Sequence, residues 1–397
     1  MKQKSIIFVK KNLGLMINFQ SKLPNTGTTI FTIMSNLANE CKALNLSQGF
    51  PSFNCHPHLQ ELVAENIRKG NNQYATMPGV LELRESLSAK YTNLWNIKYN
   101  PQTEITIVAG ATEALYCAFA TFVNKGDEVI VIEPCYDLYV PSIEIHGGVP
   151  VFYTLTPANN YKIDWDELAK KITTKTRAIV INSPQNPNGG ILEKSDLEAI
   201  AKMVENTNIL LISDEAYEHI VYDGAEHWSL MRHPALKERT LICGSFGKTY
   251  HTTGWKIGFV LANERLTAEF RKIHQWINFS INTPIQYAYA EFLKTESHYL
   301  ELSAFYQQKK DLFLDSIKNS RFEVLPSKGT FFQSLCFKNI SDENDFDYAQ
   351  RLTREIGVAS IPLSVFYHQK NDHKILRFCV AKDDEMLLEA GKRLSKL

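Results

Sequence analysis

The chain has 397 residues, of which 44% are hydrophobic and 22% are charged, as in an ordinary globular protein. Basic and acidic residues number 43 each, so no charge excess favours binding to nucleic acid or to an anionic membrane. No apolar run approaches the length of a membrane span. The length exceeds one ordinary core and favours two domains, one large and one small.

The seven cysteines are scattered, odd in number and form no CxxC pair. Several lie in apolar runs such as LYCAF and LICGSF, which is typical of buried thiols. We therefore expect a reducing compartment, the cytoplasm, and no disulfide framework. The first residues, MKQKSIIFVKKNLGLM, are too charged for a signal peptide, and we interpret residues 1–17 as a loose extension in which Met16 offers another start.

From residue 104 onward, β-rich apolar runs alternate with helical segments. Strands are predicted at 104–110, 127–134, 148–155, 176–184, 208–217, 240–246 and 255–262. Residues 111–123 and 194–206 have helical character, and Ser195 with Glu198 predicts a capping box in the second helix. Buried strands separated by helices favour an α/β fold with a mostly parallel sheet covered on both faces.

The sequence pattern changes after about residue 285. A long polar helix at 298–319 is followed by an extended segment, a helix at 346–357, a strand at 374–382 and a closing helix. This order predicts a smaller α+β domain. We divide the chain into an N-terminal extension and arm that packs with the small domain (1–45), a large domain (46–285) and a small domain (286–397).

Residues that could contact a ligand stand at or just after the ends of five of the predicted strands. In chain order they are Gly110, Ala111 and Thr112; Tyr136; Asn186; Asp214 and Tyr217; and Ser245 and Lys248. Each has an ordinary explanation when taken alone, namely a helix start, packing, a turn or a surface charge. Because ligands of open α/β sheets bind at the carboxyl ends of the strands, these residues are expected to meet in one site.

Together these residues match the needs of one ligand. A helix N-terminus with a threonine can hold a phosphate, and an aromatic ring can lie on a flat ring. An amide can bind a phenolic oxygen, a carboxylate can pair with a basic ring nitrogen, and a lysine can capture a carbonyl. These are the requirements of pyridoxal 5′-phosphate, and no metal site is predicted.

From about Phe19 to the C-terminus, the chain resembles the fold-type I, class I and II aminotransferases, and among them the methionine and kynurenine/glutamine aminotransferases. The segments that carry the resemblance are SKLPNTGTTIFTIMSNLA, NLSQGFPSF, NQYATMPGV, GATEAL, EPCYDLY, SPQNPNGG, ISDEAYEHI, SFGKTYHTTGWKIG, FSINTP, IPLSVFY and LRFCVAK. The resemblance implies a large domain with a mostly parallel seven-stranded sheet between helices and a smaller α+β domain. It also implies transfer of an amino group from an amino acid to a 2-oxo acid.

The resemblance also implies the role of each site residue. Lys248 would carry the cofactor as a Schiff base and shuttle a proton, Asp214 would pair with the ring nitrogen, and Tyr217 would bind the phenolic oxygen. The phosphate would contact Gly110, Ala111, Thr112, Ser245 and Lys256, and Tyr136 would lie on the face of the ring. Asn186 would bind the phenolic oxygen and the substrate. Arg377 and the Gly49 backbone would bind the substrate carboxylate. Tyr74 would reach the phosphate of a neighbouring subunit, which implies a homodimer with shared sites. Many relatives carry arginine where Lys256 stands, and lysine keeps the charge but loses the bidentate fork.

Three other functions compete with transamination as interpretations of the sequence. A C–S β-lyase on the same fold would use the same lysine and aspartate, and the two activities differ in keto-acid dependence and ammonia release. A nicotinamide dehydrogenase needs G-x-G-x-x-G where the chain has GATEAL. A DNA-binding regulator would need a further module, for which roughly 45 residues before the main domain leave no room.

The expected amino donors are methionine, phenylalanine, tyrosine, kynurenine and glutamine. A dicarboxylate would need a second cation besides Arg377. The segment 274–284 offers Trp276, Phe279 and Asn282 but no arginine. Phe19 and Thr28–Phe31 in the arm, with Phe366 and Tyr367, would add apolar walls, although these aromatics could instead simply pack the core.

Overall fold

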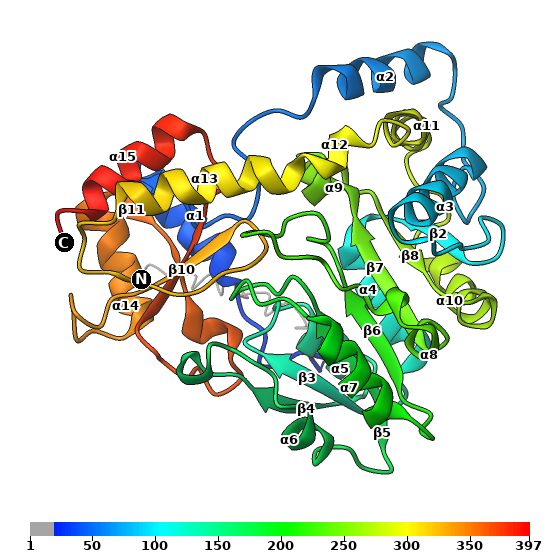
Figure 1. Cartoon of the computed structure of the whole chain (residues 1–397), viewed down its shortest axis with the longest axis horizontal. Helices are drawn as coiled ribbons and strands as arrows, with labels where there is room; N and C mark the ends of the chain where they lie inside the picture. The colour runs from blue at the N-terminus through cyan, green and yellow to red at the C-terminus, as the bar shows by residue number, and fades with distance from the viewer. Residues whose placement is uncertain (1–19) are drawn as a thin grey trace, which may run out of the picture.

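The computed structural model describes residues 20–397, so Met16 and Phe19 lie outside the described residues. A large sheet lies beside a smaller one (Figure 1). The large sheet has seven strands in the order β2–β8–β7–β6–β5–β3–β4. The strands are β2 (Ile105–Val108), β3 (Glu128–Glu133), β4 (Val149–Thr154), β5 (Thr176–Asn182), β6 (Leu210–Asp214), β7 (Thr240–Ser245) and β8 (Gly258–Leu261). Each strand lies within a predicted apolar run, which confirms the prediction of a seven-stranded α/β sheet.

One strand of the large sheet is reversed. β8 pairs antiparallel with both β2 and β7, whereas the pairs from β7 through β6, β5, β3 and β4 are parallel. The first residue of β8, Gly258, therefore stands opposite Val108 and Ser245, which end their strands. Residues that precede β8 thus join residues that follow the other strands at one edge of the sheet.

Helices cover both faces of the large sheet. Along β5, Ala178 and Val180 belong to one apolar cluster, whereas Ile179 and Ile181 belong to another, as the alternation of a strand requires. Helices α4 (Gly110–Phe122), α5 (Tyr139–Ile145) and α10 (Glu264–Ile277) contribute to the first cluster. Helices α3 (Leu81–Trp95), α6 (Trp165–Ala169), α7 (Lys194–Val204) and α8 (Pro234–Lys237) contribute to the second.

The start of α7 differs from the prediction. The N-cap is Glu193, whose backbone N–H donates to the Asp196 carboxylate at 2.7 Å. The capping box predicted between Ser195 and Glu198 is therefore wrong. The helix begins at Lys194, so Ser195 already lies inside the first turn and cannot act as its cap.

The smaller sheet is antiparallel, with the order β12–β13–β10–β9. Its strands are β9 (Glu323–Val324), β10 (Phe332–Cys336), β12 (Ile361–Pro362) and β13 (Ile375–Cys379), and the helices near it are α13 (Leu302–Ser316), α14 (Asp345–Arg351) and α15 (Asp384–Leu394). A π-helical turn, Leu352–Ile356, follows α14. Helix α13 runs from α12 (Ser297–Leu300) toward α15 (Figure 1).

The N-terminal part of the described chain packs on this smaller unit. Strand β1 (Leu44–Asn45) pairs in parallel with β11 (Val358–Ala359), and α1 (Ile30–Glu40) contacts β11 and β12. Helix α11 (Thr283–Phe292) packs against α2 (Pro57–Arg68) and α3. The divisions at residues 45 and 285 stay predictions. No helix in residues 20–397 has the length and apolar character needed to cross a bilayer.

Candidate active site

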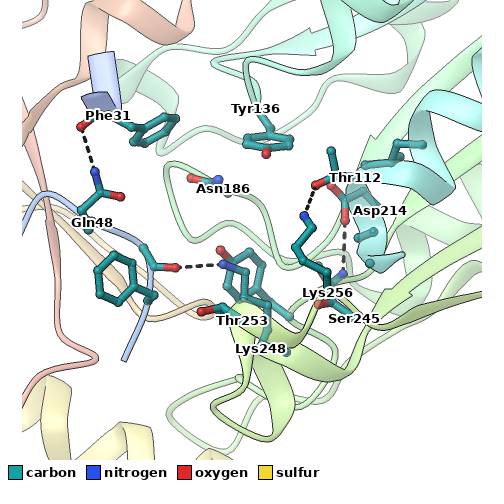
Figure 2. A pocket seen from close by; sticks show the side chains of 18 of the residues that line it. Phe31, Gln48, Thr112, Tyr136, Asn186, Asp214, Ser245, Lys248, Thr253 and Lys256 are labelled. Carbon is teal, nitrogen blue, oxygen red and sulfur yellow. Dashed lines mark hydrogen bonds between the residues drawn. The ribbon is translucent and has the colours of Figure 1, made fainter. Parts of the chain in front are cut away.

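A cavity of about 300 Å³ lies at the carboxyl edge of the large sheet and is lined on the other side by residues of the smaller unit, among them Phe332 on β10 and Arg377 on β13. Twelve of the predicted site residues line it, namely Gly49, Gly110, Ala111, Thr112, Tyr136, Asn186, Asp214, Tyr217, Ser245, Lys248, Lys256 and Arg377. Tyr136, Asn186, Lys248 and Lys256 surround one space (Figure 2). Parallel strands bring their carboxyl ends to one edge, which is why residues far apart in sequence meet here.

Lys248 lies on the short helix α9 (Phe246–Thr249), which follows β7 directly. Its amine donates to the Gly49 carbonyl at 2.8 Å. Desolvation, helped by the nearby cations Arg377 and Lys256, lowers the pKa of Lys248 to about 8. A lysine with this pKa is partly neutral near neutral pH, and the neutral amine is the nucleophilic form.

Asp214 ends β6 and is buried. Burial raises the pKa of this carboxyl, and hydrogen bonds from the Tyr139 hydroxyl at 2.7 Å and the Ala216 N–H at 3.2 Å oppose the rise. Tyr139 was not predicted as a site residue. It is the first residue of α5, and the second tyrosine of EPCYDLY was the available signal in the sequence.

The start of α4 forms an anion cradle. Gly110 opens the helix with φ +78°, a left-handed conformation that favours glycine, and the backbone N–H groups of the first turn have no helical partner. The Lys256 amine donates to the Thr112 hydroxyl at 3.2 Å (Figure 2). A Cβ at Gly258 would lie only 2.7 Å from the Gly110 backbone, so glycine is required there as well. This arrangement suits a phosphate-sized anion.

Arg377 lies in the middle of β13 and is 1% exposed. Its guanidinium donates to the Asn186 side-chain oxygen at 2.7 Å and to the Ser47 carbonyl at 3.2 Å. Its Nε has no hydrogen-bond partner, and within residues 20–397 it forms no ion pair with a carboxylate. Desolvation lowers the pKa of Arg377 to about 10. A buried cation that lacks an anion suits a ligand carboxylate.

Aromatic side chains form the walls beside Arg377. Phe31, Phe50 and Phe332 line the cavity, and the guanidinium carbon lies 3.8 Å from the centroid of the Phe332 ring. Phe31 was predicted, whereas Phe50, Phe332, Gln48 and Thr253 were not, because nothing in their local pattern separates them from core or loop residues. The Gln48 amide donates to the Phe31 carbonyl at 2.8 Å and so joins the arm to this wall (Figure 2).

Two other predicted wall residues lie behind the cavity. The Phe366 ring is 5.1 Å from the Arg377 guanidinium carbon, yet it does not line the cavity. The Tyr367 hydroxyl donates to the Leu155 carbonyl at 3.1 Å and is buried there. Both residues are therefore packing residues in this structure, the alternative left open by the sequence.

The residues predicted to serve a neighbouring subunit lie away from this cavity. Tyr74 is 82% exposed and packs edge-on against Phe279, with 5.5 Å between ring centroids. Trp276 is 83% exposed. Asn282 caps α11 by accepting from the Ile285 N–H at 3.3 Å. Within residues 20–397 no cluster of histidine, cysteine, aspartate or glutamate is placed to hold a metal ion.

The family model for class I and II aminotransferases matches residues 42–394. The chain belongs to this aminotransferase family. The aminotransferase is 45% identical over 379 residues to the methionine aminotransferase of Escherichia coli strain K12, covering 95% of this chain and 98% of the relative. It is 35% identical over 428 residues to the kynurenine–oxoglutarate transaminase of Dictyostelium discoideum, covering 98% of both chains.

The solved structures agree with this assignment. The crystal structure of an Escherichia coli protein identified as a methionine aminotransferase matches the aminotransferase with a TM-score of 0.94 at 44% identity. That match covers 96% of this chain and 100% of the other. The predicted family and fold are thus confirmed.

Proposed function

We propose that this aminotransferase uses pyridoxal 5′-phosphate to move the amino group of an apolar, sulfur-containing or aromatic amino acid to a 2-oxo acid. The expected donors are methionine, phenylalanine, tyrosine, kynurenine and glutamine. The observation that carries the proposal is the convergence, in one cavity, of the anion cradle, the buried Asp214, the amine of Lys248 and the unpaired Arg377.

The residues around the cavity fit this cofactor. The α4 N-terminus, Ser245 and Lys256 would hold its phosphate, and Tyr136 would lie on its ring. Asn186 and Tyr217 would bind its phenolic oxygen, and the Asp214 carboxylate would hold a proton on the ring nitrogen, since an adjacent anion favours the charged form. When bound, the cofactor supplies a ring that accepts the electrons left on the substrate Cα when its proton departs.

Lys248 is the proton carrier in this proposal. Burial lowers the pKa of its amine to about 8, so the free amine can both accept and give up a proton near neutral pH. The free amine would take the proton from the substrate Cα and pass it to the cofactor carbon C4′, so one group would act as general base and then as general acid. Its hydrogen bond to the Gly49 carbonyl holds the free amine inside the cavity.

The substrate preference follows from the charges and walls of the cavity. In the described chain, the cations that line it are Lys248, Lys256 and Arg377, and the proposed roles of the two lysines leave Arg377 alone for substrate. The Asp214 carboxylate and the rings of Phe31, Phe50 and Phe332 would disfavour a second carboxylate. The names of the relatives, a methionine aminotransferase and a kynurenine transaminase, support the same preference.

The substrate test compares kcat/KM for methionine, phenylalanine and aspartate with one common 2-oxo acid. Methionine and phenylalanine should exceed aspartate clearly. Aspartate that matches or exceeds them would show that the cavity accepts a second carboxylate and would refute the proposed preference. Ammonia release that does not depend on a 2-oxo acid would instead indicate a β-lyase.

The cofactor test uses Lys248→Ala. The variant should lose transamination and also the covalent cofactor linkage that borohydride traps in the wild type. Peptide mapping of the trapped product locates the modified lysine. Trapping at any other lysine would overturn the assignment of Lys248.

We also propose that the enzyme is a homodimer in which Tyr74 completes the site of the second copy. The exposed rings of Tyr74, Trp276 and Phe279 are unusual for a free surface and suit burial against another chain. Sedimentation should therefore report a dimer. A monomer that retained full activity would refute this assembly.

The cytoplasm is our proposed compartment. All seven cysteines are free thiols, and five of them are buried. This pattern suits a reducing environment, in which no disulfide is needed for stability. Fractionation of the source cells with an antibody against the enzyme would test the location.

A further inference from the structure

Lys382 is a buried lysine that the proposed chemistry does not use. It is 3% exposed, and its amine donates to the Phe50 carbonyl at 2.8 Å and to the Gln48 carbonyl at 3.4 Å. In the described chain it forms no ion pair with an acidic side chain. A buried ammonium without an anion is unfavourable. The two hydrogen bonds to carbonyls therefore suggest that Lys382 has a role other than pairing with a charge.

The two carbonyls belong to a segment, Leu46–Ser52, that lies along the end of β13. The Leu46 carbonyl accepts from the Cys379 N–H at 2.8 Å, and the Ser52 N–H donates to the Ala381 carbonyl at 3.1 Å. These backbone bonds attach the segment at its two ends. Between them, the amine of Lys382 is the side-chain donor that reaches the carbonyls on either side of Gly49.

Gly49 is the residue of this segment that faces the reaction. Its carbonyl accepts from the Lys248 amine at 2.8 Å, and the neighbouring Ser47 carbonyl accepts from Arg377 at 3.2 Å. A Cβ at Gly49 would lie 2.8 Å from the ring of Phe332, so no side chain fits there and the Gly49 backbone itself lies against the ring. The orientation of the Ser47–Gln48 and Gly49–Phe50 peptide planes therefore affects the carboxylate site and the proton carrier, respectively.

We propose that Lys382 is a positioning residue that holds the Gln48–Gly49 and Phe50–Pro51 peptide planes, the two that flank the Gly49–Phe50 peptide, so that the Gly49 carbonyl faces Lys248 and the nearby Ser47 carbonyl faces Arg377. The proposal rests on the proposed function, since it assigns to this backbone a part in binding the substrate carboxylate. Without the ammonium, the Gln48 and Phe50 carbonyls lose their shared donor, and the planes can rotate away from the cavity. Lys382 acts only through the segment, because it does not line the cavity.

The test compares Lys382→Met with a matched control, Lys374→Met. Lys374, just before β13, also donates to two backbone carbonyls, those of Asp342 at 2.9 Å and Glu343 at 2.6 Å, but does not line the cavity. Hydrogen–deuterium exchange of residues 46–52 is measured on the full chain with and without cofactor, and steady-state kinetics use methionine as donor. Thermal unfolding of both variants is recorded in parallel.

In K382M, amides of the segment should exchange about tenfold faster, and KM for methionine should rise about tenfold with a smaller change in kcat, as expected for a lost hydrogen bond from a charged donor. K382R should recover most of both properties, and K374M should change neither. Unchanged exchange and KM in K382M would overturn the proposal, as would a loss of thermal stability alone. If the wild type does not transaminate methionine, the proposed function fails while the exchange result still decides the role of Lys382. If K382M does not fold, K382Q is judged by the same criteria.

Discussion

The substitution Tyr139→Phe removes the hydrogen bond that the Tyr139 hydroxyl donates to the Asp214 carboxylate. The bond is 2.7 Å long, and both groups are buried, with 2% of Tyr139 and 6% of Asp214 exposed. A hydrogen bond to an ionised group contributes about 1.5–3 kcal/mol. Since about 1.4 kcal/mol is a factor of ten, kcat/KM should fall about tenfold to a hundredfold near neutral pH.

The pH profile of this variant gives the sharper test. Burial raises the pKa of Asp214 and the Tyr139 hydroxyl opposes that rise, so removing the hydroxyl should raise the pKa further. In the proposed function Asp214 must be ionised to hold a proton on the ring nitrogen, and it loses its charge as the pH falls through its pKa. The acidic limb of kcat/KM should therefore move to higher pH.

The control is Tyr367→Phe, which removes another buried tyrosine hydroxyl, bound to the Leu155 carbonyl at 3.1 Å. It should affect stability similarly and leave the acidic limb in place. Profiles are measured with methionine and one 2-oxo acid from acidic to mildly alkaline pH. An acidic limb that does not move in Y139F would refute the proposed link between Tyr139 and Asp214.

Three further changes test other parts of the site. Gly258→Ala should lower thermal stability and cofactor affinity, because its Cβ would lie 2.6 Å from the Gly244 carbonyl oxygen and 2.7 Å from Gly110; normal unfolding and normal cofactor titration would contradict this. Arg377→Lys should raise KM for the amino donor about tenfold or more, because lysine lacks the bidentate fork; a loss in kcat alone would argue against carboxylate binding. Lys248→Met should remove a pH-dependent contribution to the free energy of unfolding of the apoenzyme. The pKa of Lys248 is about 8 in the folded protein and 10.5 ordinarily, so between these values the unfolded chain binds more protons and the wild type gains stability as the pH rises. Urea unfolding across that window should give a shallower pH dependence for K248M, and identical slopes would refute the burial argument.

The chemistry of the strand ends could be predicted from sequence because it depends on a rule of topology. Once seven apolar runs are accepted as strands of a mostly parallel sheet, Thr112, Asn186, Asp214 and Lys248 must approach one edge. No long-range contact has to be known for that step. The family resemblance then added Lys256, which precedes its strand, and Arg377, which lies in the middle of one.

The contacts that support these residues could not be predicted in the same way. Tyr139 reaches Asp214 across 75 residues of chain, and Lys382 reaches Phe50 across 332. Such pairs depend on how α5 and the segment Leu46–Ser52 pack, and no local spacing encodes that packing. The wrong N-cap prediction for α7 has a different cause. Two residue pairs have the spacing of a capping box, Glu193 with Asp196 and Ser195 with Glu198, and the residue at which the helix begins selects the first pair.

The reversed direction of β8 places the two lysines of the cavity, Lys248 and Lys256, on one connection of the large sheet, apart from Arg377. Ser245 and Gly258 stand opposite each other in the β7–β8 pair, so the connection that carries both Lys248 and Lys256 leaves and rejoins the sheet at the same rung. The backbone positions of Lys248 and Lys256 are therefore both set by one connection of the large sheet. Arg377 belongs to the other sheet, so a change in the angle between the sheets would alter its reach to Lys248 while the two lysines kept their spacing. In the proposed function, the cofactor site would keep its geometry during such a change, whereas the site for the substrate carboxylate would move with the smaller sheet.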